Sequence, residues 1–415
     1  MEGGSRVGRR VKLILLLTLS LLATLLSAAA ASAQPGNLAT AADTRPESVQ
    51  TDSQPATTDP AAVEMSNEKV EQYWNRVMNE YGGFLPEDRA PTLKEALTSG
   101  SGLSVGGVLS GLMKYLFHEL LVNGKLLGSI VILTVFSMIL ETLQSAFEKQ
   151  TVSKVAYSIT FMVLLVLAVN SFNVGIGYAK DAIGNMVDFM MAVVPLLFTL
   201  LASMGNVVSV TVMHPFIVFM IHTMSTVIYA VVFPLLFFST ILHIVSSIST
   251  RFKVTQLANL LRSISVGILG LFVTLFLGVI SVQGTSSAIA DGVTLRTAKY
   301  VAGTFIPVVG RMFSDASDTV ISASLLVKNA VGLTGVITLI LFCAFPAIKI
   351  LSISVIYTIA AAVMQPLGDS PIIKCLQTVG KNMVYVFASL AAVGLMFFLA
   401  VTILIAAGNI SVMMR

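Results

Sequence analysis

Charged residues are scarce in this sequence: Asp, Glu, Lys and Arg together make up 11% of its 415 residues. Soluble domains carry about 25% charged residues, because their surfaces must face water. A chain of this length, with 55% hydrophobic residues and so few charges, cannot cover the surface of a soluble fold. The composition therefore predicts an all-α, polytopic membrane helical bundle for which lipid is the main solvent.

Cysteine and clustered charge are also in short supply. The two cysteines, Cys343 and Cys375, form neither a disulfide framework nor a zinc-finger pattern. The net charge of +4 is dispersed, which argues against nucleic acid as a partner. His118-Glu119 begins like a zinc-protease helix, but Val122 stands where the second histidine is needed. We therefore predict a protein that is not an enzyme and that has no cofactor and no metal site.

The N-terminus, residues 1–33, has the three parts of a cleavable secretory signal peptide. A basic segment, Arg6–Lys12, precedes a leucine-rich stretch, Leu13–Ser27, which is too short to span a bilayer comfortably. Small residues at Ala31 and Ala33 predict cleavage after Ala33, and an uncleaved first helix is the alternative. Residues 34–66 are rich in Ala, Thr, Asp, Pro and Ser and are predicted to form a disordered extracytoplasmic linker.

Residues 67–121 are predicted to hold amphipathic helices outside the cytoplasm or at the membrane interface. Val70, Trp74 and Tyr81 recur with helical spacing on one face, and charged residues occupy the other. Gly82-Gly83 ends this first helix. Its aromatic residues suit a membrane interface, but a cap packed over the bundle explains the pattern equally well. A second amphipathic stretch, residues 103–121, leads into the first span.

Residues 122–415 contain hydrophobic segments that predict a multi-span membrane domain. Two of them, Pro215–Ser246 and Val331–Met364, are long enough to hold two helices each, and Pro234 and Pro346 predict the breaks. With both runs divided, the domain has about seven to nine transmembrane helices. The other segments are Leu126–Leu143, Val155–Phe172, Phe189–Val208, Val266–Val282 and Met383–Ala407.

The two halves of this domain share a proline pattern. The separation between Pro195 and Pro307 equals that between Pro234 and Pro346. Broken helices at matching positions line the central site of many transporters. The pattern therefore indicates an internal repeat, and coincidence among the 13 prolines is the alternative.

Basic residues between the hydrophobic segments predict the orientation of the chain. The positive-inside rule places connections rich in Lys and Arg in the cytoplasm. The basic residues concerned are Lys149, Lys154, Arg251, Lys253, Arg262, Lys374 and Lys381. With these inside, the C-terminus is expected outside. The short apolar segment Tyr300–Phe313 is interpreted as a half-span or re-entrant helix.

Polar residues within the hydrophobic segments are candidate functional residues, because such groups are costly in lipid and face the interior of a bundle. They are His214, His222, His243, Glu141 and Arg311. A proton or ion pathway is one interpretation, and hydrogen bonds between helices are the other. The charged region Gly284–Lys328 is expected to line a water-filled cavity, to dock a partner, or to form solvated surface helices.

Several long and largely polar strings carry a resemblance to a known family. They are VEQYW (70–74), EYGGFLP (80–86), NGKLLG (123–128), TVSKVAYS (151–158), KVTQLANLLR (253–262), TLRTAK (294–299), DTVISAS (318–324) and FPAIK (345–349). With them, the chain from Val70 to Arg415 resembles the stage III sporulation protein AE family of endospore-forming bacteria. The predicted linker has no part in the resemblance.

The resemblance implies an integral membrane component of a multiprotein, channel-like or secretion-like complex that links mother cell and engulfed forespore. Such a complex supports late forespore gene expression and spore formation. The expected partners are other membrane proteins of that complex and a cytoplasmic ATPase, and the expected location is the mother-cell-derived outer forespore membrane, with the N-terminal region extracytoplasmic. On this interpretation Trp74, Arg251, Lys253 and Arg262 are candidate partner-docking residues. The alternative function is a stand-alone secondary transporter of unknown substrate.

Overall fold

The structure is a computed structural model that describes residues 60–84, 105–146, 151–248, 254–305, 309–367 and 370–413. The predicted signal peptide and most of the predicted linker lie outside these ranges. Within them every element is helical, as expected for an all-α protein. The first helix, α2 (Pro60–Tyr81), begins inside the segment assigned to the linker, so residues 60–66 are helical rather than disordered.

The chain combines short helices with helices of more than 40 residues. α2 is followed by the short turn η1 (Gly82–Phe84), α4 (Val105–Val122) and α5 (Gly124–Ala146). The remaining elements are α6 (Thr151–Ser203), α7 (Val207–Val227), the π-helical segment η2 (Ile228–Val232), α8 (Phe233–Ile248), α9 (Thr255–Phe305), α10 (Val309–Met364), η3 (Gln365–Leu367) and α11 (Pro371–Met413).

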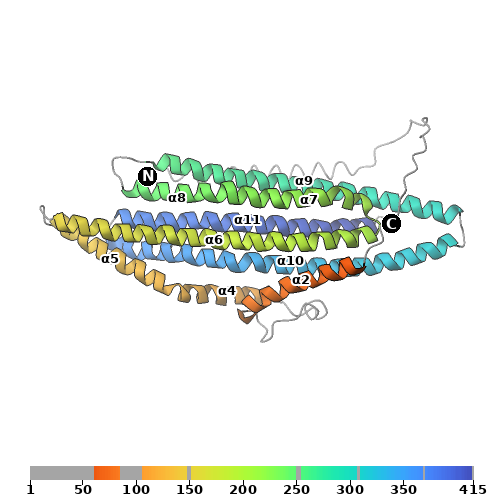
Figure 1. The fold of residues 1–415 in the computed structure, drawn as a ribbon, viewed down its shortest axis with the longest axis horizontal. Helices are drawn as coiled ribbons and strands as arrows, with labels where there is room; N and C mark the ends of the chain where they lie inside the picture. Colours follow the sequence, from red (N-terminus) through yellow and green to blue (C-terminus); the bar gives the residue numbers. More distant parts are fainter. Residues whose placement is uncertain are drawn as a thin grey trace.

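The helices form an elongated bundle with α11 at its centre (Figure 1). α11 packs against α10 and α6 on one side and against α9 and α8 on the other. α7, η2 and α8 follow one another and lie beside α9 as an outer layer, while α2, α4 and α5 lie along the opposite side. The core between them is mostly apolar, with Met186, Val386 and Phe397 among its fully buried side chains.

Five of the described helical segments are long and apolar enough to cross a membrane, and the bent pair α4–α5 adds a sixth if it is counted as one span. The bundle is nevertheless too long to lie wholly in lipid. α10 alone has 56 residues, about 84 Å at 1.5 Å per residue. Because the hydrocarbon core of a bilayer is about 30 Å thick, much of the bundle must extend beyond it.

The predicted count of seven to nine spans is wrong for the described residues, for two reasons. Val155–Phe172 and Phe189–Val208 are predicted as separate spans, but one helix, α6, contains the first and continues through Pro195 to Ser203 within the second. α10 likewise continues through Pro346, where a break was expected. Only Pro234 coincides with an irregularity, since the π-helical segment η2 ends directly before the first turn of α8. The predicted matching breaks of an internal repeat are therefore not seen at Pro234 and Pro346.

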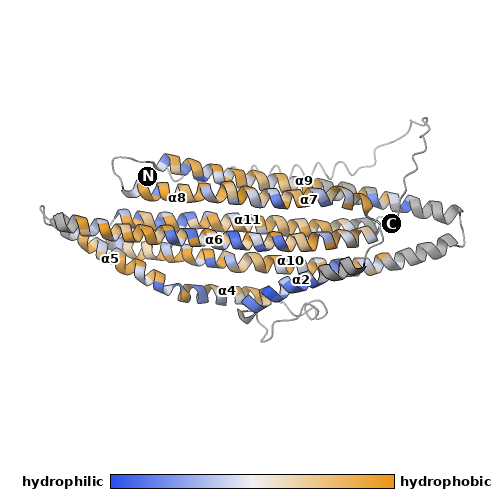
Figure 2. Cartoon of the chain, viewed as in Figure 1, coloured by the Kyte–Doolittle hydropathy of each residue, from blue (hydrophilic) through white to orange (hydrophobic). Residues whose placement is uncertain are grey.

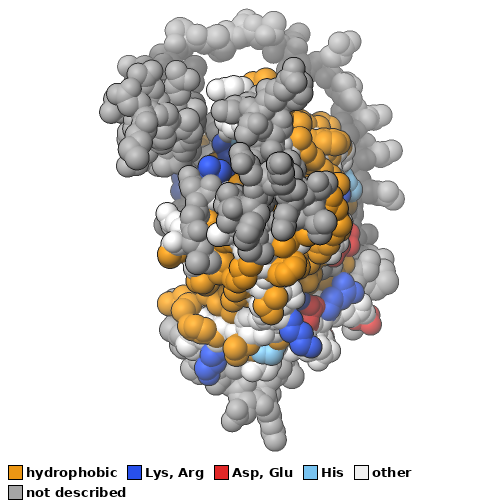
Figure 3. All heavy atoms as spheres, turned by 90° about the vertical axis from the view of Figure 1, so that its left-hand side faces the viewer, with side chains coloured by type: hydrophobic (Ala, Val, Ile, Leu, Met, Phe, Trp, Pro, Cys, Tyr) orange, Lys and Arg blue, Asp and Glu red, His pale blue; other side chains and the backbone are white. Residues whose placement is uncertain are grey.

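The helix connections divide between the two ends of the bundle. The α5–α6, α8–α9 and α10–α11 connections lie at one end, on the left of Figure 1, which we call the basic end. Seen from this end, Lys and Arg side chains lie among hydrophobic ones (Figure 3). The α6–α7 turn, the α9–α10 connection and the end of α11 lie at the opposite, distal end. Gly205 makes the tight α6–α7 turn with a φ of 83°, which a side chain would disfavour.

The segment Tyr300–Phe313 is not a separate half-span. It contains the end of α9 and the start of α10, and residues 306–308 between them lie outside the described residues. The charged region Gly284–Lys328 thus forms the distal parts of two long helices, which extend past the ends of the other helices (Figure 1).

Candidate functional site

The predicted intramembrane polar residues do not come together in one place. His214 and His222 lie eight positions apart on α7, where His214 is partly buried edge-on to Phe198 at 5.2 Å and His222 is exposed. His243 lies on α8. The side chains of Glu141 and Arg311 lie outside the described residues. Among the residues that the structure places, nothing forms a proton or ion pathway from these groups.

His243 belongs instead to a polar network between α8 and α9. Its ring nitrogens lie 2.8 Å from the Ser239 carbonyl oxygen and 3.1 Å from Asn259 Oδ1. A neutral imidazole can donate to only one of these two oxygens. Arg262 donates to the same Asn259 oxygen at 2.7 Å and lies 5.1 Å above the Tyr385 ring of α11. Arg262, predicted to dock a partner, is therefore engaged within the bundle near its basic end.

A second buried contact joins α8 to α11 close to this network. Asn382 is 1% exposed and donates to the Thr240 hydroxyl at 3.0 Å. Thr240 in turn donates to the Leu236 carbonyl at 2.8 Å. Hydrogen bonds of this kind between apolar helices fix their register, because polar groups are costly when left unpaired in such surroundings.

At the distal end, the carboxylate of Asp291 on α9 caps the N-terminus of α7. Its two oxygens accept hydrogen bonds from the backbone N–H groups of Val208 and Ser209, at 2.9 and 3.0 Å. The first N–H groups of a helix have no partner within the helix, and its N-terminus carries partial positive charge. The buried Asp291 therefore satisfies two such donors and balances the helix dipole, which ties α7 to α9.

Lys328 on α10 makes the matching contact at the C-terminal part of α11. Its ammonium group is buried and donates to the Ile405 carbonyl at 2.8 Å and to Asn409 Oδ1 at 3.1 Å. Gly408 leaves the space for it, since a Cβ there would meet Lys328 Nζ and Leu201. A cation is favoured near the C-terminal end of a helix dipole. Asp291 and Lys328 thus hold helix ends together.

The candidate docking residue Trp74 faces the bundle. Its side chain is 0% exposed, between α6 and α10. Neighbouring rings complete the contact: Tyr73 packs edge-on against Phe189 at 5.6 Å, and Tyr81 stacks on Phe345 at 4.1 Å. The prediction that the Trp74 side chain contacts a partner is therefore wrong for this structure. Of the two predicted alternatives, α2 is a packed cap.

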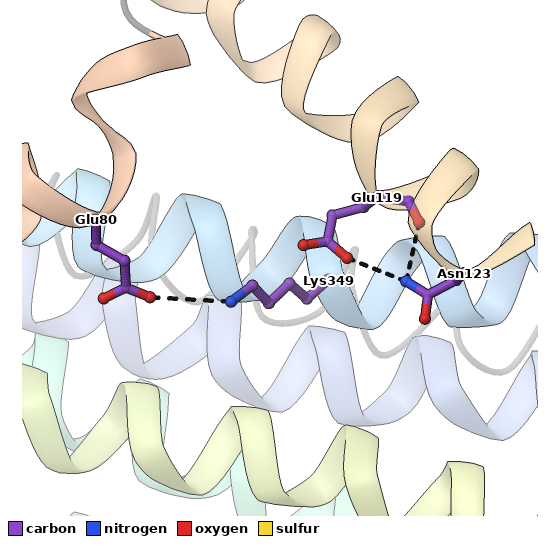
Figure 4. A network of polar contacts seen from close by, with 4 residues as sticks. All are labelled: Glu80, Glu119, Asn123 and Lys349. Carbon is purple, nitrogen blue, oxygen red and sulfur yellow. Dashed lines mark hydrogen bonds and ion pairs between the residues drawn. The ribbon is translucent and has the colours of Figure 1, made fainter.

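Lys349 of α10 anchors the C-terminal end of α2 through weak polar contacts. Its Nζ lies 3.9 Å from Glu80 and 5.7 Å from the Tyr81 ring (Figure 4). Nearby, Asn123 bridges the carboxylate and the backbone carbonyl of Glu119 where α4 meets α5. Burial raises the pKa of Tyr73 on α2, and the Asp188 carboxylate of α6 raises it further, so this phenol stays neutral.

Arg251 and Lys253 lie outside the described residues, and a survey of the described His, Cys, Asp and Glu side chains finds no group of three that could hold a metal. The sequence contains a Gly-x-Ser-x-Gly pattern, Gly102–Gly106. A nucleophile elbow places that serine between a strand and a helix. No strand occurs in the ranges that the structure describes.

Comparison with known proteins gives two matches. The family model for stage III sporulation protein AE matches residues 89–408. The Bacillus subtilis (strain 168) protein named stage III sporulation protein AE is 54% identical over 354 residues, which cover 85% of this chain and 89% of that protein. No solved structure matches.

Proposed function

The chain belongs to the stage III sporulation protein AE family, and from this premise we propose that it is an integral membrane component of a sporulation-specific, channel-like or secretion-like complex. The complex links the mother cell to the engulfed forespore and is required for late forespore gene expression and spore formation. This chain contributes membrane helices and no catalytic step. The observation that carries the proposal is the set of five apolar helices, or six with the bent pair, in a protein of a sporulation family.

The arrangement of basic residues supports one orientation. Lys149, Arg251 and Lys253 between helices, and Lys374 and Lys381 at the start of α11, belong to one end of the bundle, which the positive-inside rule favours as the cytoplasmic end. The opposite end carries fewer basic residues, Arg296, Lys299 and Arg311 beside the α9–α10 connection. When α6, α7–α8, α9, α10 and α11 each cross the membrane once, successive crossings end on alternate sides. The end of α11 then lies outside. In this orientation the basic end faces the mother-cell cytoplasm. A signal peptide cleaved after Ala33 places the N-terminal region between the two forespore membranes.

The proposed partners follow from the membrane location of the bundle and from the cytoplasmic position of its basic end. Other membrane proteins of the complex surround the bundle, and a cytoplasmic ATPase meets the basic end. Lys374 and Lys381 are exposed there on α11, whereas Arg262 is held in the His243 network. We expect charge reversal at Lys374 and Lys381 to reduce co-purification of the ATPase. Unchanged co-purification would remove the ATPase from the proposal.

A stand-alone transporter receives no support from the described residues. That interpretation depends on intramembrane histidines near broken helices, but His222 is exposed and α10 is unbroken at Pro346. Complementation separates the two functions. A tagged copy expressed only in the mother cell should restore heat-resistant spores to a deletion strain and co-purify with other sporulation membrane proteins. Restoration by forespore-only expression, with the protein purified alone, would contradict the proposal.

A further inference from the structure

One flank of the bundle carries exposed polar groups at a depth where membrane helices normally carry none. On α2 these are Gln72, Asn75, Arg76 and Asn79, and on α6 it is Asp188; all five are exposed. We call this surface the polar face. Two depressions lie along it, of about 540 and 270 Å³. Figure 2 shows the contrast between hydrophilic α2 and the hydrophobic helices on the far side of the bundle.

Contacts through α6 fix the depth of the polar face relative to the other helices. On one side of α6, Phe189 packs against Tyr73 of α2 at 5.6 Å. On the other, the Tyr229 hydroxyl of η2 donates to the Lys180 carbonyl at 2.7 Å, and Phe198 packs against His214 of α7. The polar face therefore lies at the same depth as residues 214–229 of α7 and η2.

At this depth the opposite flank is mostly apolar, with His222 as an exposed polar side chain of α7. Phe219 of α7 is 60% exposed and Leu271 of α9 is 57% exposed. α9 runs beside α7 over this whole length, since Ser265 contacts the Val232 carbonyl at 3.2 Å and Asp291 caps α7. Residues 208–232 and 265–290 contain no Asp, Glu, Lys or Arg. Residues 208–232 extend about 37 Å at 1.5 Å per residue, enough to cross a hydrocarbon core of about 30 Å.

The two flanks cannot both face acyl chains. A bilayer that meets the α7–α9 flank at this depth would surround Arg76 and Asp188 on the other flank, where charged groups are costly unless they reach water or a partner. We propose that the polar face lines a water-filled passage at the depth of the membrane, with the α7–α9 flank toward lipid. This proposal rests on the proposed function. It makes α2 the lining helix of the conduit, and the polar lining suits the passage of hydrophilic solutes.

The composition of the polar face favours water over a protein partner. Stable interfaces have a buried core of aromatic or aliphatic anchors, and charged residues are depleted there. The anchors of α2, Trp74 and its neighbours, are already used against α6 and α10. The exposed positions of α2 between Glu71 and Glu80 are all polar. Such a face gives a second protein little to bind, whereas water hydrates it fully.

Thiol labelling tests the proposal in open membrane sheets that hold the complete complex. Asn75→Cys and Asn79→Cys report on the polar face, and Phe219→Cys and Leu271→Cys are the matched controls on the apolar flank. The native cysteines are replaced by alanine, and each variant must still restore spore formation. A charged, membrane-impermeant methanethiosulfonate should modify the two α2 cysteines at least about tenfold faster than the two controls. A lipid-soluble maleimide should modify all four.

Three results would overturn the proposal. The α2 cysteines could react as slowly as the controls, which would place lipid against α2. The controls could react as fast as the α2 cysteines, which would place this part of the bundle outside the membrane. The α2 cysteines could react only after the other membrane proteins are deleted, which would make the polar face a protein interface. Failure of the proposed function is distinguishable, since it would appear as normal sporulation in a strain that lacks the chain.

Discussion

Replacing Trp74 by alanine should release α2 from the bundle. The indole is fully buried between α6 and α10 and is the largest buried side chain among the described residues of α2. Truncation of a buried Phe or Trp to Ala costs about 3–5 kcal/mol, because contacts are lost and a cavity remains. Since each 1.4 kcal/mol is a factor of about ten, the fraction of molecules with α2 detached should rise on the order of a hundred- to several-thousandfold.

Limited proteolysis measures this release directly. A detached helix of 22 residues is marginal in water, so trypsin should cleave after Arg76 at a rate that follows the open population. The experiment uses the full chain in nanodiscs. Gln72→Ala, on the exposed face of the same helix, should change the rate by no more than about twofold. Equal cleavage of the wild type and Trp74→Ala would refute the packed position of α2.

Substitutions at three further sites test contacts at the helix ends and on the surface, with thermal unfolding of the purified protein as the common measurement. Asp291→Ala should cost about 1–3 kcal/mol, because it leaves two buried N–H groups of α7 unpaired; Asp291→Asn, which keeps one acceptor oxygen, should cost less. Gly408→Ala should destabilise the protein by about 1–3 kcal/mol, because the added Cβ collides with Lys328. Combining it with Lys328→Met should relieve part of this loss. Gly278→Ala, where a Cβ meets open space, should be neutral or stabilising. Lys349→Met should cost less than about 1 kcal/mol, since its ion pair with α2 is 3.9 Å long and its side chain is 24% exposed.

The helical periodicity of α2 was readable from the sequence, but its location was not. Val70, Trp74 and Tyr81 were predicted to share one apolar face, and all three are buried. An apolar stripe of this kind suits lipid headgroups as well as protein, because both accept aromatic side chains. The contacts with Phe189 and Phe345 distinguish protein packing from a lipid-headgroup location. These contacts join residues that are far apart in the chain.

The span count failed because local polarity was taken for a helix break. The residues between Phe172 and Phe189 include Lys180, Asp181 and Asp188, which read as a loop between two spans. In the structure they are simply the exposed side of a continuous helix. Pro346 was likewise expected to end a helix, but packing against neighbouring helices tolerates a proline within an apolar helix.

The sequence likewise identified the charged region but not the contacts that its residues make. The sequence showed that the region up to Lys328 is unusually charged, and it favoured a cavity, a docking surface or solvated helices for that region. Asp291 and Lys328 instead meet the ends of α7 and α11, a use that depends on which helix ends lie beside them. No spacing rule connects Lys328 to Ile405, so a single sequence cannot reveal the pair.

A late forespore reporter gene tests the central claim most directly. It is scored after engulfment in a strain that lacks this chain, beside the same strain with a wild-type copy expressed in the mother cell. The account predicts that the deletion strain completes engulfment but loses reporter expression, and that the mother-cell copy restores it. Normal reporter expression and normal spores without the chain would contradict its role in a conduit between mother cell and forespore.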